Sequence, residues 1–125
     1  MILKARELEK LNETLEQLLP LQLKMPFAYK LACIARETRE NNAMIQTMRQ
    51  EIIERYAKRD AEGSMIFDGN KIKIDETKIG ELNKELDNLY NREIELKSSK
   101  IDLVDIQDLD LTVGQIEILI PLINE

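Results

Sequence analysis

The fold is decided by one long stretch, residues 27–56, which reads FAYKLACIARETRENNAMIQTMRQEIIERY. Its apolar side chains recur at alternating spacings of four and three residues, which is the pattern of a helix that buries a single seam. The seam positions are Phe27, Leu31, Ile34, Thr38, Asn41, Ile45, Met48, Ile52 and Tyr56. Because Pro26 suits the first turn of a helix, we expect one continuous helix over residues 26–60.

Two polar residues, Thr38 and Asn41, interrupt this seam at its centre. Such a pair can fix the register of the partner helix, line a buried hydrogen-bonded spot, or mark the place where the partner helix ends. Threonine and asparagine are mostly found in contact with water. We therefore expect both side chains to be half-exposed.

Two further helices are predicted, over residues 1–19 and 76–98, because apolar residues again recur at spacings of three and four. The first face consists of Leu8, Leu11, Leu15 and Leu18, and the second of Ile79, Leu82, Leu86, Leu89 and Leu96. Pro20 ends the first helix because it has no amide hydrogen to donate. The short connection between the second and third helices predicts that they run antiparallel.

Residues 64–75 are expected to form a β-hairpin around a two-residue turn at Gly69 and Asn70. The resulting cross-strand pairs are Asp68 with Lys71, Phe67 with Ile72, and Met65 with Ile74. One face of this hairpin is apolar, and two strands alone are marginally stable. The hairpin therefore needs a support or a third strand.

The C-terminal region begins with an extended segment over residues 101–111, which alternates in part like a strand and is a candidate third strand. Thr112 and Gln115 form a capping-box pattern that starts a short helix over residues 112–123. That helix is so apolar that it must be covered, either by the helical hairpin or by another chain. No lysine or arginine follows Lys100.

These segments together predict a mostly-α α+β fold in a single domain, residues 1–125. Its architecture is a long antiparallel helical hairpin plus an N-terminal helix, with a small β-hairpin and a short C-terminal helix.

The composition argues against catalysis, since histidine is absent and Cys33 is the only cysteine. Histidine is the usual general base and the commonest metal ligand near neutral pH, so we expect no catalytic residue, no metal and no cofactor. Cys33 lies among apolar residues and is expected to be a buried packing residue. The acidic run Asp102, Asp105, Asp108 and Asp110 lacks the glycine turn of a calcium loop, and we expect it to be a solvated edge.

The net charge of −6 and the pI of about 4.9 bear on partners. An acidic protein gains nothing from neutralising phosphates, so direct binding to nucleic acid is disfavoured, while basic protein surfaces are favoured. An acidic tail that mimics nucleic acid is a further alternative. No signal-peptide core and no membrane-spanning apolar run is present, so we expect a cytoplasmic protein without a membrane partner.

Four stretches carry a family resemblance. They are Leu18-Leu19-Pro20, Ala28-Tyr29-Lys30-Leu31, residues 56–63 from Tyr56 to Gly63, and residues 111–123 from Leu111-Thr112 through Pro121-Leu122-Ile123. In these stretches the chain resembles a family of small uncharacterised proteins from phages and prophages of Gram-positive bacteria, grouped as a domain of unknown function. The resemblance implies a viral origin, a place in the host bacterial cytoplasm and an α-rich fold, and it transfers no catalytic residue.

We therefore expect a non-catalytic phage protein that acts by protein–protein binding, either as a virion-assembly accessory or as an inhibitor of a host defence system. The alternative is a self-assembling coiled-coil module, since the heptad-like seam would also suit a homo-oligomer. The candidate partner-binding residues are Tyr56, Ile66, Phe67, Tyr90, Ile116 and Ile120. Tyr29 is expected in the core.

Overall fold

The computed structural model describes residues 1–124, and their contacts divide the chain into two compact units. Unit 1 contains residues 1–42 and the chain from residue 93 onward, whereas unit 2 contains residues 43–92. We expected a single domain from the chain length. One long helix, α2 (Phe27–Arg55), contributes its first half to unit 1 and its second half to unit 2. The mostly-α α+β fold is confirmed.

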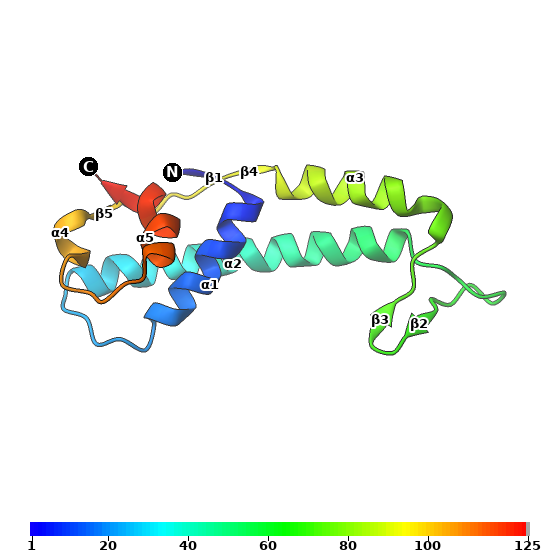
Figure 1. Ribbon diagram of the computed structural model, residues 1–125, viewed down its shortest axis with the longest axis horizontal. Coiled ribbons are helices and arrows are strands. Elements are labelled where there is room, and N and C mark those ends of the chain that lie inside the picture. The colour runs from blue at the N-terminus through cyan, green and yellow to red at the C-terminus, as the bar shows by residue number, and fades with distance from the viewer. Residues whose placement is uncertain (125) are drawn as a thin grey trace. The chain divides into compact units, whose positions relative to one another are not determined.

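Unit 1 combines helices with two small sheets (Figure 1). Its elements besides α2 are β1 (Ile2–Lys4), α1 (Ala5–Leu18), β4 (Glu93–Glu95), β5 (Ile101–Asp102), α4 (Leu103–Ile106), α5 (Val113–Leu119), the 3-10 turn η2 (Ile120–Leu122) and β6 (Ile123–Asn124). Strand β1 pairs antiparallel with β4, and β5 pairs parallel with β6. Each sheet therefore joins segments that are distant in the sequence.

The leucines of α1 form one part of the core of unit 1, and side chains of α2 and of the C-terminal elements form the rest. Leu8, Leu11, Leu15 and Leu18 are all buried, as their spacing predicts. The helix begins at Ala5 and not at the chain start, because Ile2–Lys4 pairs with β4 and is held in extended form. It ends at Leu18, so the stop predicted from Pro20 is confirmed.

Unit 2 contains the second half of α2, β2 (Phe67–Asp68), β3 (Lys71–Ile72), the 3-10 turn η1 (Glu76–Lys78) and α3 (Ile79–Tyr90). Helix α3 runs antiparallel beside α2 (Figure 1). At the end of α2, Arg55 Nη1 lies 3.0 Å from Glu85 Oε2 on α3. Earlier along α2, Met48 Sδ accepts at 3.8 Å from the guanidinium of Arg92, which follows the end of α3. The predicted helical hairpin is thus confirmed.

The β-hairpin has the predicted turn and the predicted central register, since Phe67 pairs with Ile72 and Asp68 with Lys71. Gly69 adopts a φ of +64°, a conformation that side chains disfavour and glycine tolerates. The prediction of an outer pair between Met65 and Ile74 was wrong, because Met65 bridges to Arg59 and Ile74 bridges to Ala57. The predicted third strand from residues 101–111 was also wrong, because the extended residues 57–59 take that place.

The two long helices end earlier than their apolar patterns predict. Helix α2 ends at Arg55 and not at residue 60, because the Lys58 amide donates to the Lys73 carbonyl at 2.8 Å and its carbonyl accepts from Ile66. Helix α3 ends at Tyr90 and not at residue 98, because residues 93–95 form β4 against β1. In both cases pairing with another segment replaces helical hydrogen bonds that the sequence would also permit.

Residues 101–111 are only briefly extended, which corrects the prediction of a continuous extended segment. The Asp102 amide donates to the Asp105 carboxylate at 3.2 Å, and this contact starts the short helix α4. Carboxylates that accept from free amides stabilise the first turn of a helix. The acidic run is therefore partly a helix start.

The polar interruption of the α2 seam is more buried than expected. Thr38 is fully buried and its hydroxyl has no hydrogen-bond partner among the described residues, whereas Asn41 is half-buried and donates to the Glu37 carbonyl at 2.9 Å. The expectation of half-exposure was therefore wrong for Thr38. An unpaired buried hydroxyl destabilises a fold, because water no longer satisfies it.

Candidate functional site

Helix α5 is started by the predicted capping box. Thr112 Oγ1 accepts from the Gln115 amide at 3.1 Å, and Gln115 Oε1 accepts from the Thr112 amide at 2.9 Å. The Gln115 side chain also donates to Gln17 Oε1 on α1 at 2.9 Å, and Leu119 and Leu122 are buried. We expected this end to be covered by the helical hairpin or another chain, and α1 is the helix that packs against it.

A second face of α5 remains open to solvent. Val113, Ile116 and Ile120 are 82%, 41% and 53% exposed. Their spacing of three and four residues places them on one side of the helix, and we call them the α5 stripe. Ile116 and Ile120 are predicted binding residues that the structure brings together. Val113 was missed, although its spacing from Ile116 could have revealed it.

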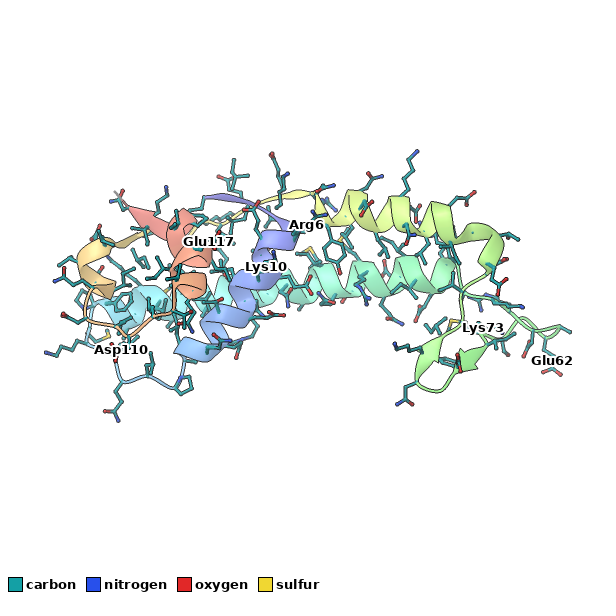
Figure 2. All side chains as sticks on the ribbon, viewed as in Figure 1. Arg6, Lys10, Glu62, Lys73, Asp110 and Glu117 are labelled. Atoms are coloured by element: carbon teal, nitrogen blue, oxygen red, sulfur yellow. The ribbon has the colours of Figure 1, made fainter. Side chains whose placement is uncertain are left out.

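A groove of about 460 Å³ lies between α1 and α5 and is called the α5 groove. It is lined by Leu3, Glu7, Lys10, Leu11, Gly114, Glu117, Ile118, Pro121 and Leu122. Figure 2 shows Lys10 on α1 and Glu117 on α5, the two helices that form the groove. With about 100° of rotation per residue, Glu117 lies between the groove and the stripe. The two features therefore form one continuous surface.

Unit 1 exposes apolar side chains elsewhere as well. Leu103 and Val104 on α4 are 61% and 62% exposed, which makes them a matched comparison for the α5 stripe. Tyr29 on α2 is 63% exposed, so the expectation that it lies in the core was wrong. Its neighbours Phe27 and Leu31 hold the buried seam positions, and Tyr29 points away from that face.

A carboxylate clasp joins α2 to the segment that follows β4. Glu37 accepts from the Lys97 amide at 2.8 and 3.0 Å, from the Ser98 amide at 3.0 Å and from the Ser98 hydroxyl at 2.8 Å. Desolvation by itself would raise the pKa of Glu37, but the hydrogen bonds from both backbone amides and the Ser98 hydroxyl, with the nearby Lys97 charge, outweigh it and lower the pKa. No sequence pattern indicated this contact.

A shallow groove of about 480 Å³ lies beside this clasp and includes Cys33. Cys33 is half-buried, so it is less buried than its apolar neighbours in the sequence predict. The two groove carboxylates are already engaged, Glu37 in the clasp and Glu40 with Arg36 Nε at 3.3 Å. Neither is thus a free base for the thiol.

The other four predicted binding residues lie in unit 2. Phe67 is 56% exposed, whereas Tyr56, Ile66 and Tyr90 are half-buried. Successive strand residues face opposite ways, so Ile66 and Phe67 belong to different faces of the hairpin. The structure therefore does not gather these four residues into one surface. At Tyr56, desolvation and the negative charge of Glu85 raise the pKa of the hydroxyl.

Two kinds of feature are absent from residues 1–124, namely clusters of metal-binding type and helices that could span a membrane. No group of three or more cysteine, aspartate or glutamate side chains in this range is arranged to hold a metal ion. Within the same range, every helix is too short or too polar to cross a membrane.

Comparison with known proteins finds no match to this chain among protein-family models, curated protein sequences or solved structures. The resemblance to phage proteins thus stays a prediction.

Proposed function

We propose that this chain is a non-catalytic phage protein that acts by binding another protein through the α5 stripe. The proposal is supported chiefly by one observation, the 41–82% exposure of Val113, Ile116 and Ile120 on a single helix face. Contiguous exposed apolar side chains lower the solubility of a protein, so they are usually retained where a partner covers them.

The phage origin is proposed from the four resembling stretches, and with it a site of action in the cytoplasm of a host bacterium. Two roles fit this class. One is an accessory that binds capsid or tail proteins during virion assembly, and the other is an inhibitor that binds a component of a host defence system.

Self-assembly through the α2 seam is the competing function. The first part of that seam is occupied within the chain, because Phe27, Leu31 and Ile34 are at most 7% exposed. A coiled coil between two copies would need these side chains at its interface. This observation favours a different protein as the partner over a second copy bound through α2.

Affinity capture from infected bacteria tests the proposal. A tagged chain is compared with the double variant Ile116→Ser, Ile120→Ser and with the control Leu103→Ser, Val104→Ser, which removes two apolar residues of somewhat higher exposure elsewhere in unit 1. We expect one set of proteins to be retained by the parent chain and the control and lost by the α5 variant.

The identity of the captured proteins separates the two roles. Capsid or tail proteins support the assembly role, and a host nuclease or sensor supports the inhibitor role. If the α5 variant captures the same proteins as the parent chain, or if none of the three chains captures any, the proposed function is wrong.

A further inference from the structure

The net charge of this chain is concentrated in its last fifth. Residues 101–125 contain six acidic residues and no lysine or arginine, whereas residues 1–100 contain 18 acidic and 18 basic residues and are neutral. The α5 stripe and most of the α5 groove belong to the acidic part. The apolar surface therefore lies mostly in the part of the sequence that carries the net negative charge.

Little of this negative charge is neutralised within unit 1. Asp102 lies 3.8 Å from Lys30 Nζ, and no other acidic side chain in residues 103–124 forms an ion pair with a described base. Glu117 is exposed between the stripe and the groove, and Asp110 is exposed on the loop that leads into α5 (Figure 2). Lys10 is the one basic residue in the lining of the α5 groove, against Glu7 and Glu117, so the charge of this surface remains negative. An apolar stripe with a negatively charged border attracts a partner of opposite charge.

Charge also decides against a second copy as the occupant. A symmetric dimer through the α5 stripe would bring the same surface of both copies together, so Glu117 and the neighbouring acids would approach their own copies. Like charges opposed across an interface destabilise it. A membrane with anionic lipids is disfavoured for the same reason.

The length of the stripe favours a helix as the partner element. Val113, Ile116 and Ile120 span eight residues, from the start of α5 to the first residue of η2, or about two helical turns. The adjoining groove of about 460 Å³ has Leu3, Leu11 and Ile118 in its lining. An amphipathic helix places apolar anchors on one face at the same spacing and keeps charged residues beside them.

We propose that the α5 stripe and the α5 groove dock an amphipathic helix of a partner protein whose apolar face is bordered by lysine or arginine. This inference rests on the proposed function and specifies the chemistry of the partner. The apolar face covers the stripe, and the basic border lies against Glu117 and Asp110.

Designed peptides of about 18 residues, long enough to form helices, test the inference with the full chain. The first has leucine on one face and lysine on the other, the second has the same leucine face with glutamate, and the third is a scrambled leucine–lysine sequence without an apolar face. Fluorescence anisotropy gives the affinity of each labelled peptide at about 0.05 M and about 0.15 M salt.

We expect the leucine–lysine helix to bind most tightly and to weaken as salt is added. The double variant Ile116→Ser, Ile120→Ser should lower its affinity by about tenfold or more, because two apolar side chains leave the interface. The variant Glu117→Lys should also weaken the lysine helix and strengthen the glutamate helix. The variant Leu103→Ser, Val104→Ser should leave all affinities unchanged, and circular dichroism should show that every variant is folded.

The inference is overturned if the scrambled or glutamate peptide binds as well as the leucine–lysine helix, or if the α4 variant weakens binding as much as the α5 variant. It is also overturned if light scattering shows a dimer that the α5 variant abolishes, since a second copy is then the occupant. A protein captured through the α5 stripe whose binding is insensitive to Glu117→Lys and to salt would contradict the basic partner and leave the proposed function standing.

Discussion

Replacing Glu37 with alanine should destabilise unit 1 by about 2 kcal/mol. The substitution leaves three donors without their acceptor, namely the amides of Lys97 and Ser98 and the Ser98 hydroxyl. Hydrogen bonds to a charged group contribute about 1.5–3 kcal/mol each where no water replaces them. Lys97 is exposed and Ser98 is half-buried, so water can bond to some of the donors that lose Glu37. The total loss of stability therefore stays near the contribution of one such hydrogen bond.

Urea unfolding followed by circular dichroism measures this change, and a loss of about 2 kcal/mol corresponds to a midpoint lowered by about 1–2 M. Hydrogen exchange should locate it, with faster exchange at the amides of Lys97 and Ser98. The matched control is Glu40→Ala, one turn further along α2, because Glu40 forms only an exposed ion pair with Arg36 at 3.3 Å. Such pairs contribute about 0–1 kcal/mol.

The same clasp predicts a pH dependence. The pKa of Glu37 lies below its ordinary value of 4.5 in the folded chain, because hydrogen bonds favour the carboxylate. The stabilisation is therefore complete above about pH 4.5 and is lost as the pH falls through the lowered pKa. The stability difference between the parent chain and Glu37→Gln should shrink over this acidic range, and it should remain constant around neutral pH.

Two results would refute this reasoning. One is equal stability of Glu37→Ala and Glu40→Ala, and the other is unchanged exchange at the amides of Lys97 and Ser98. Either would mean that water satisfies these donors as well as the carboxylate does.

Three further substitutions test the core, the seam and the hairpin. Leu8→Ala should cost about 2–5 kcal/mol in urea unfolding, because this side chain is fully buried in unit 1, and a smaller loss would mean that the site collapses. Thr38→Val should stabilise the chain by about 1 kcal/mol by removing an unpaired buried hydroxyl, whereas Thr47→Val, at an exposed hydroxyl bonded to a backbone carbonyl, should change the midpoint little. Gly69→Ala should destabilise the hairpin by about 1 kcal/mol because φ is +64° there, whereas Gly80→Ala in α3 should have the opposite sign, and proteolysis of the hairpin loop distinguishes the two.

Local features of the fold could be predicted because they depend on neighbouring residues. The Thr112 capping box, the stop before Pro20 and the register around Gly69 all appear in the structure as expected. Each rests on hydrogen bonds or backbone geometry within four residues. Two of the three α5 stripe residues could be named for the same reason, since helical spacing is local.

The ends of the long helices could not be predicted, because partners far along the chain set them. The sequence EIEL at residues 93–96 alternates polar and apolar residues and suits a strand, yet its apolar residues also continue the helical pattern of α3. Pairing with Ile2–Lys4 favours the strand and buries Leu96. That signal was present but ambiguous.

The amino-acid sequence by itself determined the central parts of α1, α2, α3 and α5, the turn at Gly69 and Asn70, and the collection of negative charge after Lys100. Only the tertiary structure decided which face of α5 meets α1 and which stays open as the stripe, and that the Glu37 carboxylate holds the segment after β4. The physical reason is range: capping, turns and periodicity act over a few residues, whereas burial depends on which distant segments the whole chain brings together.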